Sequence, residues 1–174
     1  MKQAAIDASV VIARLLGEPR PSWVDELVAD VGSGRTTLIA PSLLWLEVGN
    51  RLARSRNITD ERALEGMLRT DALGIQPVEV GPPLRLRALL LAREHGLTIY
   101  DATYLAVAEA AKAPLVTLDR HLERIAAAIG LGRTGGISRV SEPAAQYGHD
   151  EVDITSLATI GAALAELRRQ YEPA

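Results

Sequence analysis

Hydrophobic and polar residues follow two periods along the first 130 positions. Short runs of β-branched and apolar residues predict buried strands, whereas longer segments with apolar residues three or four positions apart predict amphipathic helices. The predicted strands are residues 3–7, 36–40, 74–80 and 113–119. The predicted helices are a segment that starts near Ser9 and stops at Gly17 and Pro19, then residues 22–31, 41–56, 60–72, 82–95, 97–112 and 120–129. Strands that alternate with helices predict an α/β/α sandwich around a mostly parallel sheet.

The character of the sequence changes after Gly130. Residues 131–153 are rich in Gly, Ser and Pro and predict a linker. In residues 154–174 the apolar positions are three or four apart, which predicts an amphipathic C-terminal helical tail. The apolar stripe consists of Ile154, Leu157, Ile160, Leu164, Leu167 and Tyr171. We therefore expect one domain over residues 1–130, followed by the linker and the tail.

Composition limits the chemistry that the chain can carry. It has no cysteine among its 174 residues, which excludes disulfides and thiolate metal sites, and its three histidines are scattered. Any metal is therefore expected to be bound by oxygen, as Mg²⁺ or Mn²⁺ is. A net charge of -3 argues against coating nucleic acid through bulk charge but permits a local grip. No apolar run is long enough to span a membrane and no signal peptide is evident, so we expect a cytoplasmic protein.

Four carboxylates stand in apolar surroundings: Asp7, Glu47, Asp101 and Asp119. Each has a structural interpretation by itself, since Asp7 and Asp119 can cap helices, Asp101 can form a capping box with Thr98, and Glu47 can point outward. Three of them fall at strand ends or helix starts on one edge of the predicted sheet. Carboxylates crowded there repel one another unless a cation lies between them, which favours a divalent metal ion. Such a cluster suits the hydrolysis of phosphodiesters.

Three segments carry a resemblance to a known family. "IDASVVIARLLGEP", "PSLLWLEVGNRL" and "LTIYDATYLAVAEAAKAPLVTLDRHL" resemble the successive motifs of PIN-domain proteins, and specifically of VapC-type toxins, over residues 3–129. The resemblance implies a PIN-like fold and an endoribonuclease that depends on Mg²⁺ or Mn²⁺. It also implies an RNA substrate, a protein antitoxin as partner, and a homodimer.

The resemblance assigns roles to individual residues. It implies that Asp7, Asp101 and Asp119 bind the metal, and that Glu47 completes the catalytic set or positions the attacking water. Ser9 and Thr117 would hydrogen-bond the metal-binding carboxylates. Beyond the motifs, we interpret three arginines as candidate contacts for RNA phosphates. The three arginines are Arg14, Arg120 and Arg124. Tyr104, one turn after Asp101, could line the groove, but an ordinary contact on a helix surface is the simpler interpretation.

Two other families that place aspartates at strand ends do not fit this sequence, and two alternative functions stay open. A phosphotransfer receiver needs an acidic pair near the first strand, and a haloacid-dehalogenase-type phosphatase needs Asp-x-Asp there, but this chain has Asp7-Ala8-Ser9. A PIN-like interaction module without turnover stays open. So does a nuclease whose tail, through Arg168 and Arg169, inhibits it in cis, although a tail that extends the core or a dimer interface is the simpler interpretation.

Overall fold

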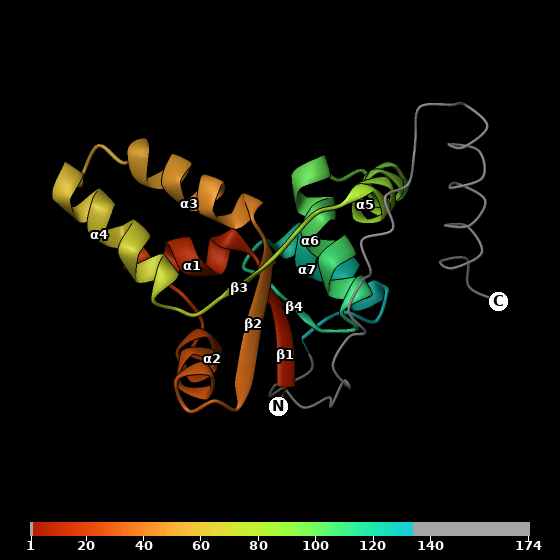
Figure 1. Cartoon of the computed structure of the whole chain (residues 1–174), viewed down its shortest axis with the longest axis horizontal. Helices are drawn as coiled ribbons and strands as arrows, with labels where there is room; N and C mark the ends of the chain where they lie inside the picture. The colour runs from red at the N-terminus through yellow and green to blue at the C-terminus, as the bar shows by residue number, and fades with distance from the viewer. Residues whose placement is uncertain (1, 134–174) are drawn as a thin grey trace.

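A computed structural model of the chain describes residues 2–133 (Figure 1). The predicted tail, and the linker beyond Arg133, lie outside the described residues. The strands are β1 (Lys2–Ile6), β2 (Thr36–Pro41), β3 (Gln76–Val78) and β4 (Leu115–Val116). The helices are α1 (Ala8–Leu15), α2 (Trp23–Gly32), α3 (Leu43–Ala53), α4 (Asp60–Asp71), α5 (Pro82–His95), α6 (Ile99–Ala110) and α7 (Arg120–Ala128).

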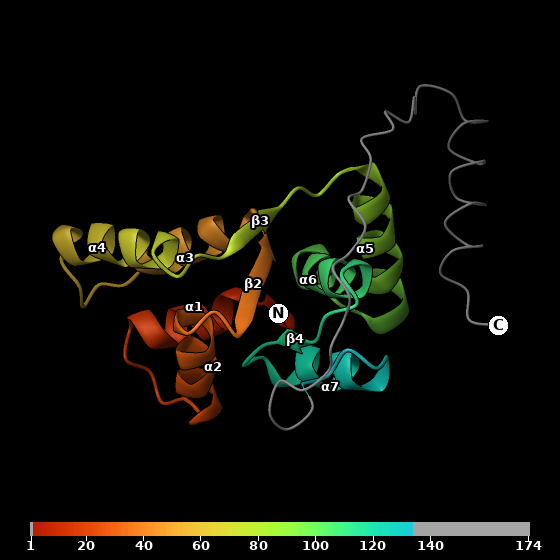
Figure 2. The ribbon, with the colours of Figure 1, turned by 60° about the horizontal axis from the view of Figure 1, so that its bottom comes forward.

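The strands form one parallel sheet in the order β3-β2-β1-β4. Helices α1 to α4 lie on one side of it and α5 to α7 on the other, as Figures 1 and 2 both show. This arrangement confirms the predicted α/β/α sandwich. Parallel strands need such crossovers, because consecutive strands must return to the same end of the sheet before they can pair.

The pairing of the central strand places two chain segments together at the carboxyl edge of the sheet. Ala5 of β1 is in register with Leu115 of β4, and Ile6 with Val116. Asp7 follows β1 directly and Thr117 follows β4 directly, so the two residues leave the sheet side by side. Ligand sites of open parallel sheets lie at this edge.

Helix α6 is the most deeply buried helix of the domain. Each of its residues from 102 to 108 is buried, and its alanines allow the neighbouring elements to approach closely. Tyr104 is the largest of the fully buried side chains, at 0% exposed. The interpretation of Tyr104 as a helix-surface contact is therefore wrong: its ring belongs to the core.

Most element boundaries differ by one or a few residues from those that the sequence predicts, and the strand expected over residues 74–80 is confined to Gln76–Val78. Two of the differences have a clear physical reason. The expected strand over residues 113–119 is reduced to Leu115–Val116, because the next backbone N–H groups bond to side chains: Leu118 N–H donates to Ser9 Oγ, and Asp119 N–H to Thr117 Oγ1. The expected helix over residues 41–56 begins only at Leu43. Pro41 ends β2 instead, in register with Val78.

The chain continues to pair with the sheet after α7. Leu115 N–H donates to Leu131 O at 2.8 Å, and Leu115 forms an isolated bridge with Gly132. Leu131 also packs against the core. Residues 131 and 132 are therefore held against the domain in the described part of the chain. None of the helices within residues 2–133 is long and apolar enough to span a membrane.

This pairing leads to a prediction for Gly132→Ala. A Cβ at position 132 would lie 2.7 Å from Ala127 Cα, which is backbone and cannot move aside. We expect the free energy of unfolding to fall by about 1–3 kcal/mol, as for other overpacked sites. Thermal or urea unfolding monitored by circular dichroism measures the change.

Gly32→Ala is the matched control, because a Cβ there meets nothing within 4 Å and Gly32 ends helix α2. Its stability should stay equal to that of the wild type or rise slightly. A Gly132→Ala protein as stable as Gly32→Ala would show that residues 131 and 132 do not pack as described.

Candidate active site

Asp7 is the most buried of the four candidate carboxylates. It is 7% exposed and caps the N-terminus of α1, where Oδ2 accepts a hydrogen bond from Ser9 N–H at 3.3 Å. The same oxygen accepts hydrogen bonds from Ser9 Oγ and, at 2.8 Å, from Thr117 Oγ1. Burial raises the pKa of Asp7, the three hydrogen bonds oppose this rise, and the charge of Asp101 adds to it.

Ser9 and Thr117 connect two distant segments around Asp7. Ser9 Oγ also accepts Leu118 N–H at 3.0 Å, and Thr117 Oγ1 accepts Asp119 N–H at 3.0 Å. Both hydroxyls thus donate to the carboxylate and accept from the backbone that follows β4. The start of α1 and the start of α7 are tied together through these two side chains.

Asp119 and Asp101 each have a local structural role. Asp119 caps α7, with Oδ1 accepting His121 N–H at 2.7 Å and Leu122 N–H at 2.9 Å. Asp101 lies in the first turn of α6, where Oδ2 accepts the hydroxyl of the capping Thr98 at 2.7 Å. Capping therefore operates as the sequence suggests, and it leaves the second oxygen of each carboxylate without a hydrogen bond from within residues 2–133.

Glu47 does not point freely outward. It is half-buried on α3, and Oε2 accepts a hydrogen bond from the hydroxyl of Tyr104 on α6. Burial raises the pKa of Glu47, the bond from Tyr104 lowers it, and the charges of Asp7 and Asp101 raise it further. Burial also raises the pKa of Tyr104 well above its ordinary value, with Glu47 as a further cause, so the phenol remains a donor.

The electrostatic coupling shows which carboxylates the fold brings together. The charge of Asp101 raises the pKa of Asp7, and the charges of Asp7 and Asp101 raise the pKa of Glu47, although the three residues come from different segments. Within residues 2–133, none of the four candidate carboxylates has an ion pair with Lys, Arg or His. The negative charge at this edge of the sheet is therefore not offset by a basic side chain of the described region.

The donors fit a hard divalent cation in kind, because all are carboxylate or hydroxyl oxygens and the charge between them is uncompensated. In the described part of the chain, however, no three acidic or histidine side chains already converge on one point. Asp101 turns toward Thr98, and Asp119 turns toward the first N–H groups of α7. Binding a metal ion would require these two side chains to reorient.

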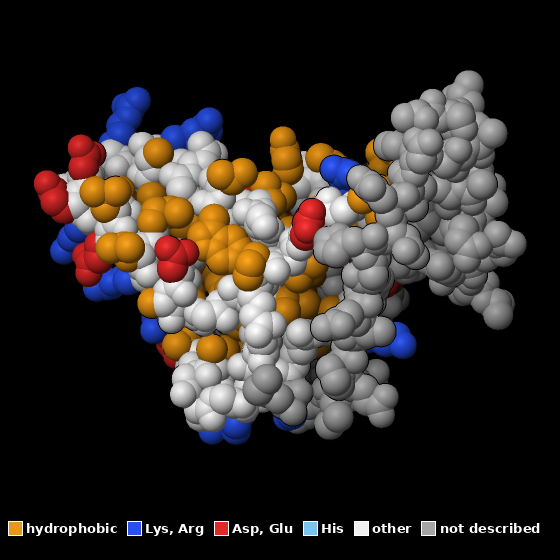
Figure 3. All heavy atoms as spheres, in the orientation of Figure 1, with side chains coloured by type: hydrophobic (Ala, Val, Ile, Leu, Met, Phe, Trp, Pro, Cys, Tyr) orange, Lys and Arg blue, Asp and Glu red, His pale blue; other side chains and the backbone are white. Residues whose placement is uncertain are grey.

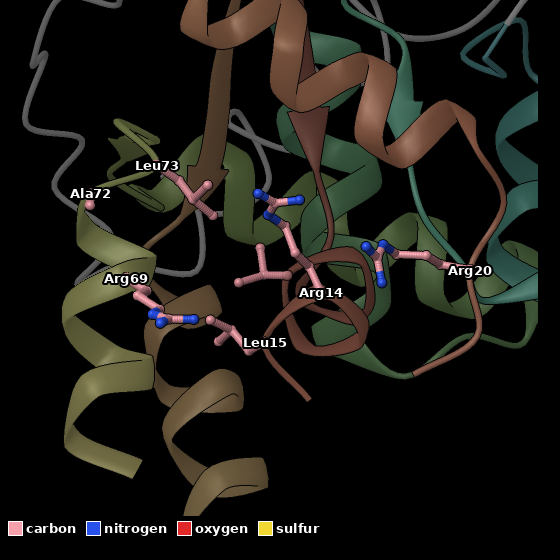
Figure 4. A pocket seen from close by; sticks show the side chains of 7 residues that line it. Arg14, Leu15, Arg20, Arg69, Ala72 and Leu73 are labelled. Atoms are coloured by element: carbon pink, nitrogen blue, oxygen red, sulfur yellow. The ribbon is translucent and has the colours of Figure 1, made fainter. Parts of the chain in front are cut away.

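The three candidate arginines lie in two places. Arg120 and Arg124 are exposed on α7, directly after Asp119 and one turn farther on. Arg14 instead pairs with Asp25 at 3.2 Å. It lines a cavity of about 460 Å³ together with Arg20 and Arg69 (Figure 4), and none of the four candidate carboxylates lines it. The structure thus does not bring Arg14 together with the acidic residues.

Tyr104 is the residue whose role sequence reasoning misjudged, because it was interpreted as a helix-surface contact and its bond to Glu47 was not foreseen. It lies three positions after Asp101, so one turn of α6 separates the two side chains. A hydroxyl at that spacing from a candidate ligand, on a helix made largely of alanine, was the available signal. The sequence could not show that its partner would be Glu47, 57 positions away.

Comparison with known proteins places this geometry in context. The sequence matches the PIN domain family over residues 4–128. It is 30% identical over 128 residues to the protein named Ribonuclease VapC3 of Pyrobaculum aerophilum, which covers 67% of this chain and 89% of that protein.

Solved structures share the fold. PAE2754 from Pyrobaculum aerophilum has a TM-score of 0.53 at 27% identity, over 71% of this chain and 78% of that chain. VapBC2 from Rickettsia felis, bound to a DNA fragment from their promoter, has a TM-score of 0.54 at 17% identity, over 71% and 92%. A toxin–antitoxin complex from Klebsiella pneumoniae has a TM-score of 0.52 at 19% identity, over 75% and 96%. At these last two identities the likeness shows the fold alone.

The environment of Asp7 leads to a prediction for the metal-free protein. Because burial raises the pKa of folded Asp7 above its ordinary value of 3.8, the folded state favours the protonated carboxyl. The stability linked to that proton is fully present below pH 3.8 and is lost as the pH rises through the folded pKa. In EDTA at pH 7 we expect Asp7→Asn to unfold about 2–4 °C above the wild type, as relief of about 1 kcal/mol would produce.

Unfolding temperatures of both proteins, measured from pH 7 downward, test this prediction, and the difference should shrink as the pH approaches 3.8. Asp60→Asn, an exposed position at the start of α4, is the matched control and should show no such gain. A variant less stable than the wild type at pH 7 in EDTA would mean that the charge on Asp7 is stabilised rather than strained.

Proposed function

Because the chain belongs to the PIN-domain family, we propose that it is a metal-dependent endoribonuclease and the toxin of a VapBC-type toxin–antitoxin system. The observation that carries the proposal is the uncompensated group of Asp7, Glu47 and Asp101 at the carboxyl edge of the sheet. Burying a carboxylate such as Asp7 without a basic partner is unfavourable, so a fold that does so needs a reason in function. The similarity to a protein named as a ribonuclease supports the choice of RNA as substrate.

In this proposal the carboxylates bind the metal ion and the neighbouring hydroxyl groups orient them. Asp7, Asp101 and Asp119 hold Mg²⁺ or Mn²⁺, and Glu47 completes the set or orients the attacking water. When bound, such an ion activates water and offsets the charge of the phosphodiester. Ser9 and Thr117 hold Asp7 in a fixed orientation through the hydrogen bonds that they donate to it.

Substrate binding falls to residues beside the carboxylates. Arg120 and Arg124 are exposed directly after Asp119, where their guanidinium groups can pair with phosphates of the RNA backbone. Arg14 is not included in this part of the proposal, because it pairs with Asp25 and lines a cavity to which none of the four carboxylates contributes.

The alternative is a PIN-like interaction module without turnover. It leaves the grouped carboxylates unexplained, since a binding surface does not require neighbouring charges that raise the pKa of Asp7 and of Glu47. It also leaves unexplained why two hydroxyls from distant segments converge on Asp7. The nuclease accounts for both features.

A cleavage assay on a mixed RNA pool tests the proposal. We expect cleavage with Mg²⁺ or Mn²⁺, none with EDTA, and a loss of about 100-fold or more in Asp7→Asn and in Asp101→Asn, because each removes a charged ligand. Mapping of the cut ends then defines the site. Asp60→Asn makes the same chemical change on the exposed start of α4 and should cleave at the wild-type rate. Cleavage that survives both Asp7→Asn and Asp101→Asn contradicts the assignment.

A second part of the proposal concerns protein partners. The similarity to a VapC protein and the fold shared with a toxin–antitoxin complex suggest a protein antitoxin as one partner. We also propose a homodimer formed through helical surface. Leu46 on α3 is 72% exposed, and Leu64 and Leu68, one turn apart on α4, are 68% and 69% exposed. Figure 3 shows the hydrophobic side chains exposed over this part of the molecule.

Sedimentation velocity at micromolar concentration tests the dimer. The chain of 18.6 kDa should sediment at about twice that mass, and Leu64→Glu with Leu68→Glu should shift it to the monomer, because two charges would be buried in the interface. Lys112→Glu changes the charge at an exposed position after α6 and should leave the dimer intact. A wild-type monomer under these conditions would refute the proposed dimer.

A further inference from the structure

Tyr104 and Glu47 form a hydrogen bond between the two sides of the sandwich. Tyr104 belongs to α6 on one side of the sheet, and Glu47 belongs to α3 on the other (Figures 1 and 2). The two side chains meet at the carboxyl edge, where Asp7 leaves β1. The tyrosine hydroxyl donates to Glu47 Oε2. The hydrogen bond thus connects Glu47 on α3 to α6, the most buried helix of the domain.

The tyrosine is itself immobile. Its side chain is 0% exposed, so the ring is held by core packing and the hydroxyl cannot swing away. The backbone amide of Ala8, the residue after Asp7, lies near enough to the tyrosine oxygen to lower the pKa of Tyr104 slightly, against the larger effect of burial. The hydroxyl therefore lies between the start of α1 and the middle of α3, and it relates the position of Glu47 to that of Asp7.

The arrangement also leaves one oxygen of Glu47 available. Tyr104 bonds to Oε2, and within residues 2–133 Oε1 accepts no side-chain hydrogen bond. A glutamate has three rotatable side-chain bonds, and ordering it on binding a ligand costs conformational entropy. A carboxylate that is already ordered through one oxygen binds a ligand through the other with less of that loss.

We propose that Tyr104 is a positioning residue, which holds the Glu47 carboxylate in place beside Asp7 and Asp101 and thereby strengthens the binding of a divalent cation. This inference rests on the proposed function, since it takes the carboxylates to be a metal site. It assigns to Tyr104 an action through Glu47 alone, without contact with the metal or the RNA.

The first test is the affinity of the full chain for Mn²⁺ and Mg²⁺, measured by isothermal titration calorimetry without RNA. Tyr104→Phe removes only the hydroxyl and keeps the ring, and we expect the Kd to rise about 10-fold or more, as for other residues that orient metal ligands. Tyr100→Phe makes the same change in the same helix. Because Tyr100 is 57% exposed, its variant should bind the metal like the wild type.

A double-mutant cycle separates positioning from general loosening of the fold. If Tyr104 acts through Glu47, then Tyr104→Phe should weaken binding in the wild-type background but have no further effect in Glu47→Gln. Additive losses, or an unchanged Kd in either single variant, would overturn the proposal. A merely structural role would lower the unfolding temperature without this dependence on Glu47.

A back-up variant and a wild-type assay separate failure of this inference from failure of the proposed function. Should Tyr104→Phe not fold, Glu47→Asp provides the test, since its shorter side chain loses the bond to Tyr104 while keeping the charge, and wild-type affinity in it would overturn the proposal. A wild-type protein that neither binds metal nor cleaves RNA contradicts the proposed function itself. Metal-dependent wild-type cleavage together with an unaltered Tyr104→Phe contradicts only the role of Tyr104.

Discussion

The structure depends on the burial of one charged group, the carboxylate of Asp7, at the point where the central strand meets its first helix. Three donors from Ser9 and Thr117 compensate part of the desolvation, and the same hydroxyls accept the backbone that follows β4. The Asp7 carboxylate thus caps the start of α1 and orients the two hydroxyls that end β4 at Val116. Its remaining strain, visible as a raised pKa, is what a cation would relieve.

The other carboxylates show how one residue can serve both local structure and chemistry. Asp119 satisfies the first N–H groups of α7, and Asp101 bonds to the residue that caps α6. In each case a single oxygen accepts these hydrogen bonds, and within residues 2–133 the second oxygen accepts none. Capping and metal binding therefore use different oxygens at these positions, although metal binding would also require the two side chains to reorient.

Glu47 is the member of the group whose position depends most on distant residues. It lies on α3, on the opposite side of the sheet from α6. The bond from Tyr104 and the burial of that tyrosine hold it toward the other carboxylates. Core packing thereby influences the charges of the site: it fixes the ring of Tyr104, and the fixed hydroxyl can donate its hydrogen bond only toward Glu47.

The order of strands and helices, the sandwich and the four unusual carboxylates follow from the sequence by itself, because hydrophobic period and turn residues act over a few positions. Local capping by Asp7, Thr98 and Asp119 was within reach for the same reason. Only the tertiary structure decided that Tyr104 is buried against Glu47, that Arg14 pairs with Asp25 away from the acidic group, and that β4 stops at Val116. Those outcomes depend on contacts between side chains of different elements, which no local pattern in the sequence connects.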